Sequence, residues 1–131
     1  LMKQSTFLTL AGGLGVIFGF GILMMPNQFM ETNGISLNEG GILVARTLGA
    51  LLFCLGVMNF LVRNAEDSSA LRAIFYGNIA IQVLSLALDI LGLASGVVNS
   101  NVWGSVVLHT MLGGGFAYFL FGKAKGIADA V

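Results

Sequence analysis

The sequence predicts an all-α integral membrane protein, built as an antiparallel up-down-up-down bundle of four transmembrane helices. Of its 131 residues, 56% are hydrophobic and only 9% are charged, whereas soluble domains average about 25% charged residues. Four apolar stretches each have the length of about 20 residues that is needed to cross a hydrocarbon core roughly 30 Å thick. Since lipid offers the backbone no hydrogen-bond partners, each stretch is predicted to be a helix.

The four predicted spans cover residues 6–25, 42–62, 73–93 and 102–121, with a short cytoplasmic tail at 122–131. They form a single domain, and their short connectors make successive helices antiparallel neighbours. Pro26 ends the first span, and Asn33-Gly34 predicts a turn in the connector that follows. The first span is longer than the apolar core of a signal peptide and lacks a small-residue cleavage site, so it is expected to be retained.

The distribution of basic residues predicts how the chain crosses the membrane. Every basic residue except Arg46 falls on one side if both termini are cytoplasmic; these residues are Lys3, Arg63, Arg72, Lys123 and Lys125. Because cytoplasmic loops are enriched in Lys and Arg, we expect both termini inside, in a bacterial inner membrane. The formal net charge is zero, so no overall field favours nucleic acid as a partner.

Small residues on the first two spans are candidates for helix packing. Helices in lipid associate through close contact of small residues and through polar side chains. The candidates are Gly12, Gly15 and Gly19 on the first span and Gly49 and Gly56 on the second. Gly15 and Gly19 form a GxxxG pattern, which is typical of tight packing inside one bundle and also of a face that accepts a partner helix.

The third and fourth spans each carry a polar stripe. Their residues are spaced so that each set falls on one helix face at 100° per residue. The third span contributes Asn78, Gln82, Ser85 and Asp89, and the fourth contributes Ser105, His109, Gly113 and Phe116. Such stripes are costly against lipid, so they are expected to face protein or a water-filled cavity.

Three ionisable residues are predicted at matching depth. Arg46 and Asp89 each lie four residues from the outer end of their spans, roughly 6 Å below the boundary, and His109 lies only slightly deeper. An Arg46–Asp89 ion pair would offset the cost of burying either charge. Three interpretations remain open: a structural ion pair, a ligand or ion site that also uses Gln82, and proton handling by His109 and Asp89.

The residue composition offers little support for a metal site, a cofactor site or a catalytic site. One His and one Cys (Cys54) are too few for a zinc or iron site, so no metal is predicted. No cofactor is predicted either, although a haem or chlorophyll could use His109 alone as an axial ligand. No catalytic residues are identified, because no nucleophile–base arrangement or phosphate-binding loop is present, and an enzyme is not the favoured class.

The stretch from Pro26 to Gly56 carries a family resemblance. It reads P-N-Q-F-M-E-T-N-G and then A-R-T-L-G-A-L-L-F-C-L-G, with Arg46 followed by Gly49 and Gly56. A proline that closes the first span, a short outer loop and this arginine–glycine pattern resemble the small uncharacterised four-helix membrane proteins of bacteria. The resemblance covers roughly a quarter of the chain, implies one four-helix domain, and carries over no functional residues.

These observations favour a non-catalytic membrane protein in contact with the lipid bilayer. The first interpretation is an accessory or structural subunit that packs against other membrane proteins or against copies of itself through its glycine-rich faces. The alternative is a carrier or receptor that binds a small amphipathic ligand, such as a lipid, a quinone-like molecule or a pigment. That ligand would lie at a polar seam between the second, third and fourth spans.

Overall fold

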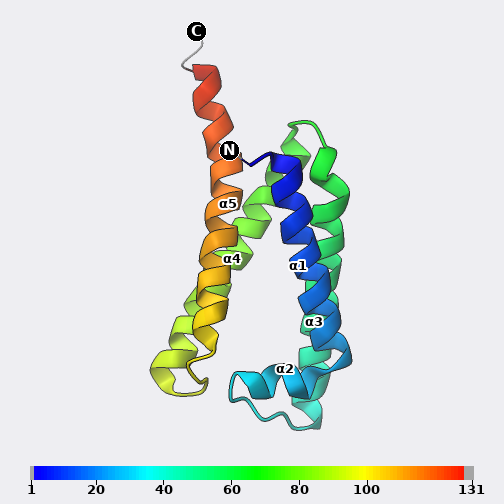
Figure 1. The fold of residues 1–131 in the computed structure, drawn as a ribbon, viewed down its shortest axis with the longest axis vertical. Coiled ribbons are helices and arrows are strands. Elements are labelled where there is room, and N and C mark those ends of the chain that lie inside the picture. Colours follow the sequence, from blue (N-terminus) through cyan, green and yellow to red (C-terminus); the bar gives the residue numbers. More distant parts are fainter. Residues whose placement is uncertain (1, 129–131) are drawn as a thin grey trace. The chain divides into compact units, whose positions relative to one another are not determined.

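The computed structural model describes residues 2–128, with side chains through residue 122. In chain order its elements are α1 (Gln4–Met24), α2 (Pro26–Thr32), α3 (Glu39–Leu61), the 3-10 turn η1 (Val62–Asn64), α4 (Ser69–Ser95) and α5 (Val102–Ala128) (Figure 1). The predicted all-α fold class is confirmed. The structure adds α2 and η1 to the four predicted helices, and α5 continues as a helix to Ala128, over residues that were expected to form a tail.

Four of these helices are long and apolar enough to cross a membrane. The candidate spans are Gln4–Met24, Glu39–Asn64, Ser69–Ser95 and Val102–Gly122. Few of the large apolar side chains of these helices are buried, as expected where lipid rather than water surrounds the protein. The chain is therefore an integral membrane protein with four candidate spans.

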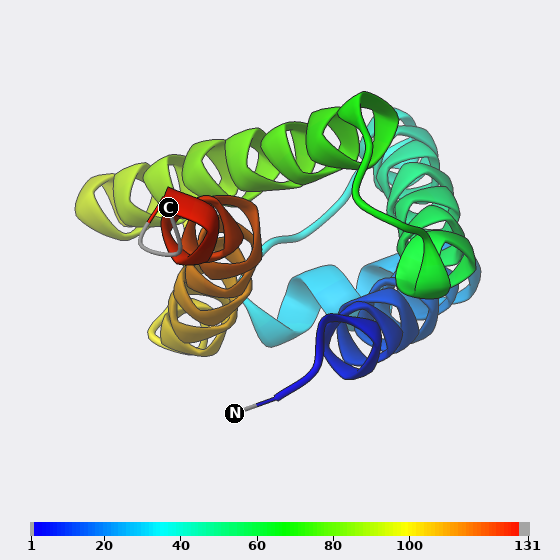
Figure 2. The same cartoon turned by 90° about the horizontal axis from the view of Figure 1, so that it is seen from above.

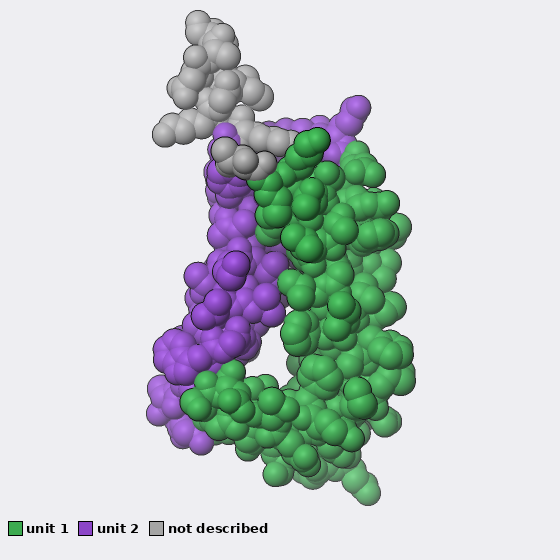
Figure 3. Space-filling view, in the orientation of Figure 1, with its two compact units in different colours: residues 1–64, 97–101 green, residues 65–96, 102–131 purple. Residues whose placement is uncertain are grey.

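The chain divides into two compact units (Figure 3). The first comprises residues 1–64 and 97–101, and the second comprises residues 65–96 and 102–131. The first is built on the antiparallel pair α1·α3 and the second on the antiparallel pair α4·α5; the members of each pair lie side by side in both ribbon views (Figures 1 and 2). A single domain spanning the whole chain stays a prediction.

The five predicted packing glycines lie where α1 and α3 meet. A Cβ atom added to Gly56 would lie 2.5 Å from the Val16 nitrogen and 2.7 Å from the Gly12 carbonyl oxygen. A Cβ on Gly49 would lie 2.5 Å from the Leu23 nitrogen. Backbone therefore approaches backbone with no room for a side chain, which is the geometry that small residues permit in membrane helices.

A short helix, α2, replaces the loop that was expected after the first span. Pro26 does end α1, but it also occupies the first position of α2, where its missing N–H and fixed φ fit a helix start. The Phe29 ring of α2 lies over Gly21 of α1 and makes an edge-to-face contact with Phe18, the ring centroids being 6.3 Å apart. A glycine at position 21 leaves the space that this ring occupies.

The loop between α4 and α5 is hydrogen-bonded to the end of α2. The Asn99 amide N–H donates to the Asn33 carbonyl oxygen (2.9 Å). The side-chain Nδ2 atoms of Asn99 and Asn101 both donate to the Thr32 carbonyl oxygen, at 3.0 and 2.7 Å. These bonds satisfy carbonyls that the end of a helix leaves without intrahelical partners. Gly34, with φ +83°, makes the tight turn beside them.

The second unit has a mixed apolar and polar interior. Ser68 caps α4, its hydroxyl accepting from the Leu71 amide N–H at 3.2 Å. Phe75 of α4 and Phe116 of α5 pack edge to face with centroids 5.7 Å apart. Asn78, 1% exposed, donates from Nδ2 to the Ile74 carbonyl oxygen at 2.9 Å. This aromatic pair lies two helical turns from Gln82 on α4 and from His109 on α5, the polar residues described next.

Candidate functional site

Two polar side chains reach the same level from opposite directions along α4 and α5. Asp89 lies six residues before the end of α4, and His109 lies seven residues after the start of α5. At 1.5 Å per residue, each is about 10 Å from its helix end. Because the two helices are antiparallel and joined by a short loop, these two ends are neighbours, and the side chains meet.

Four side chains form the polar cluster of the second unit: Gln82 and Asp89 from α4, and Ser105 and His109 from α5. The Ser105 hydroxyl donates to Asp89 Oδ2 at 2.7 Å. His109 Nδ1 lies 2.6 Å from Gln82 Oε1, an oxygen that can only accept, so Nδ1–H is the donor. His109 Nε2 faces Asp89 Oδ2 at 3.9 Å. This arrangement is called the α4·α5 cluster below.

Helical spacing explains how the cluster is assembled. Gln82 and Asp89 are two turns apart on α4, and Ser105 and His109 are one turn apart on α5, so each pair shares a face. Gly113, one turn beyond His109, lets the helices approach closely: a Cβ added there would lie 3.2 Å from the Gln82 Cβ. This approach places Gln82, which is only 6% exposed, within reach of the imidazole.

The cluster leaves two acceptors facing each other. With its proton on Nδ1, a neutral imidazole presents a lone pair at Nε2, and an ionised carboxylate has only acceptors. In these states neither group donates to the other across the 3.9 Å that separates them, whereas protonation of His109 would make the two an ion pair. The side chains of His109 and Asp89 are 23% and 21% exposed, so the gap between them is partly open rather than sealed in the protein.

The structure joins some of the predicted site residues and leaves others untested. Asp89, His109 and Gln82 come together as the polar stripes predicted. Arg46 lies exposed on α3, in the first unit, and its ion pair with Asp89 stays a prediction. Ser105 was placed on the correct face of its helix but was not named as a site residue; its spacing of four from His109 was the signal that pointed to it.

A haem or chlorophyll bound through His109 would have to use Nε2, because Nδ1 is engaged by Gln82. Asp89 Oδ2 lies 3.9 Å from that nitrogen. As for metal ions, the described part of the chain contains no group of three or more His, Cys, Asp or Glu side chains that could hold one.

No family model matches the chain, and no match is found among curated proteins or among solved structures. The likeness of residues 26–56 to small four-helix bacterial membrane proteins therefore stays a resemblance. Its architectural implication, four long apolar helices, is what the structure shows.

Proposed function

We propose that this protein is a non-catalytic carrier or receptor that binds a small amphipathic ligand at the α4·α5 cluster. The observation that supports the proposal is a pair of acceptors, Asp89 Oδ2 and His109 Nε2, which lie 3.9 Å apart inside candidate spans. The Ser105 hydroxyl is the one donor to Asp89 within the cluster. Ionisable groups within membrane helices are costly and mark functional sites by default. A bound polar head group would satisfy both acceptors, and the apolar part of the same molecule would lie among the helices or in lipid.

The role of accessory subunit loses one of the two features that suggested it. That role was inferred from the lack of soluble domains, ligand clusters and catalytic motifs in the sequence, and from glycine-rich faces able to accept a partner helix. In the structure the glycines of α1 and α3 pack against each other: Gly12 against Gly56, and Gly19 against Gly49. These faces are filled within one chain, so they offer nothing further to a partner, and binding at the α4·α5 cluster is the function that we favour.

Purification in a mild detergent tests this proposal. Wild-type protein is expected to be monodisperse and to carry a co-extracted amphipathic molecule above the detergent background, detected by mass spectrometry. Asp89→Asn should lower the amount retained, because it removes the charge of the cluster while keeping its volume. Gly77→Ala is the matched control on α4, because its added Cβ meets no atom within 4 Å. A stable complex with other polypeptides and no retained small molecule would contradict the proposal and favour the subunit role.

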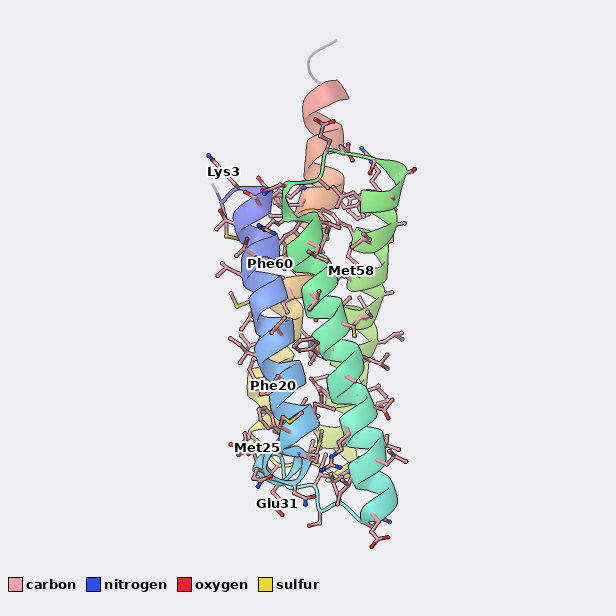
Figure 4. The ribbon with its side chains drawn as sticks, turned by 90° about the vertical axis from the view of Figure 1, so that its right-hand side faces the viewer. Lys3, Phe20, Met25, Glu31, Met58 and Phe60 are labelled. Carbon is pink, nitrogen blue, oxygen red and sulfur yellow. The ribbon has the colours of Figure 1, made fainter. Side chains whose placement is uncertain are left out.

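We further propose that both termini face the cytoplasm, in a bacterial inner membrane. Lys3 is the N-cap residue of α1, and Arg63 lies just after the end of α3. Because α1 and α3 are antiparallel, both residues lie at the same end of the pair. Glu31, in α2, lies toward the opposite end (Figure 4). This segregation of basic and acidic residues supports cytoplasmic termini by the positive-inside rule.

Cysteine labelling on intact cells checks this orientation. Single cysteines would replace Ser36, Glu66 and Ser100, all exposed, after Cys54 is changed to Ala. A membrane-impermeant maleimide should label positions 36 and 100 on intact cells and position 66 only after lysis. Labelling of position 66 from outside would show that the orientation is reversed.

A further inference from the structure

Asp89 Oδ2 and His109 Nε2 are close enough to share one hydrogen-bond donor placed beside them. Asp89 Oδ2 and His109 Nε2 are 3.9 Å apart, too far for a direct hydrogen bond and too close for two separate guest atoms. A nitrogen donor placed beside them can lie about 2.7–3.2 Å from both acceptors at once. A guest atom that bonds both acceptors donates two hydrogen bonds, as an ammonium nitrogen or a water oxygen does, and of these two only the ammonium carries a charge.

The charge of the cluster restricts the guest further. Within the α4·α5 cluster the Asp89 carboxylate is bonded only to the neutral Ser105 hydroxyl, and the Gln82 carbonyl oxygen holds His109 in the tautomer that presents a lone pair. An anion in a poorly hydrated place is stabilised most by a cation that also donates to it. An alcohol has one O–H and no charge, whereas a quaternary ammonium has the charge but no N–H.

Apolar side chains surround the cluster on the same helix faces. Leu86 and Leu93 lie one turn before and after Asp89, and Leu112 lies one turn after His109; all three are half-buried. A guest that reaches the acceptors from the membrane passes along these leucines, so an alkyl chain attached to the head group would remain in apolar surroundings.

We propose that the ligand of the α4·α5 cluster is a long-chain primary amine, bound as its ammonium ion with N–H donors to Asp89 and His109. This inference rests on the proposed function and names the chemical class that the site takes. The amine can belong to a lipid head group or to a free alkylamine, and both present the same –NH₃⁺ group to the two acceptors.

Three matched probes test the class on the wild-type protein in phosphatidylcholine nanodiscs. Dodecylammonium supplies charge and N–H donors, dodecyltrimethylammonium supplies charge alone, and dodecanol supplies a neutral hydroxyl. Binding, measured by native mass spectrometry against empty nanodiscs, should be at least tenfold tighter for dodecylammonium than for either analogue. Because this comparison uses no variant, it does not depend on whether a mutant folds.

Variants locate the binding at the cluster. Asp89→Asn should weaken dodecylammonium binding by about 10- to 100-fold, the loss expected for one charge-assisted hydrogen bond. His109→Phe should weaken it by about tenfold. Thr110→Val is the control, because its hydroxyl bonds the Val106 carbonyl oxygen outside the cluster, and it should bind as wild type does.

The outcomes separate this inference from the proposed function. Equal binding of the three probes would show that the ligand is not an amine. The same conclusion would follow if the wild type retained a molecule without an amine group and Asp89→Asn lost that molecule. If no probe binds and nothing is co-extracted, the proposed function itself fails. An aminophospholipid in the extract would show that the amine belongs to a lipid head group, and a free alkylamine would show that it does not. Either result supports the proposed amine ligand.

Discussion

Changing Gly19 to alanine should strongly destabilise the α1·α3 pair. The new Cβ would collide with the backbone nitrogen of Phe53 and would lie 2.8 Å from the Gly49 carbonyl oxygen. Backbone atoms cannot rotate away as a flexible side chain can, so the two helices must separate. Overpacking of this kind costs about 1–3 kcal/mol, and we expect the upper end of that range because the contact is between two backbones.

Thermal unfolding in detergent, followed by circular dichroism, measures this effect. Gly13→Ala is the matched control on the same helix, because its Cβ meets no atom within 4 Å, and it should melt at the wild-type temperature or slightly above, since alanine is the better helix former. Gly49→Ala should be as harmful as Gly19→Ala. The double variant should lose less than the sum of the two, because both methyl groups open the same contact. Equal melting of Gly13→Ala and Gly19→Ala would rule out this packing.

The four spans could be predicted from the sequence because lipid imposes one dominant requirement, a long apolar helix. The first three predicted spans, 6–25, 42–62 and 73–93, lie within four residues of the observed ends of α1, α3 and α4. The fourth starts at residue 102 as predicted and continues further. Past residue 121 the apolar pattern stops but no proline follows, so a polar sequence that suggests a tail is still compatible with a helix.

The sequence could not predict the contacts that depend on long separations along the chain. Thr32 and Asn101 are hydrogen-bonded although they are 69 positions apart in the sequence, and both belong to stretches whose sequence predicts only polar turns. The helix α2 was missed for a related reason. Seven residues are too few to show a helical period, and Pro26 signals a helix start as well as a helix end.

The candidate site was partly predictable because helical periodicity fixes which residues share a face. The spacing of Gln82, Asp89 and His109 was sufficient to place them on facing stripes. Spacing alone could not show which atoms meet, and it gave Asp89 a cation, Arg46, as its partner. The structure shows that Asp89 accepts from Ser105 and faces the imidazole, and the Arg46–Asp89 pair stays a prediction.

Asp89→Leu should raise the stability of the ligand-free protein and abolish amine binding. The substitution removes a charge from a candidate span, where an ionised group without a counter-ion is unfavourable. Replacing buried charges by apolar side chains of similar volume is often neutral or stabilising, and here we expect a gain of about 1–2 kcal/mol. Ser105 loses its acceptor but can donate to a carbonyl one turn earlier on its own helix, as Thr110 does.

A double-mutant cycle with Arg46 tests whether the partner of Asp89 is a ligand or the Arg46 guanidinium. If the Asp89 carboxylate binds a ligand and does not contact Arg46, Arg46→Leu and Asp89→Leu should have additive effects on the melting temperature. If Arg46 is the counter-ion, Asp89→Leu should lose about 3–5 kcal/mol by leaving the guanidinium unpaired, and the double variant should recover most of it. Such a recovery would assign the cation to the chain itself and remove the need for an amine. We expect additivity, together with a loss of dodecylammonium binding greater than 100-fold in the two variants that carry Asp89→Leu.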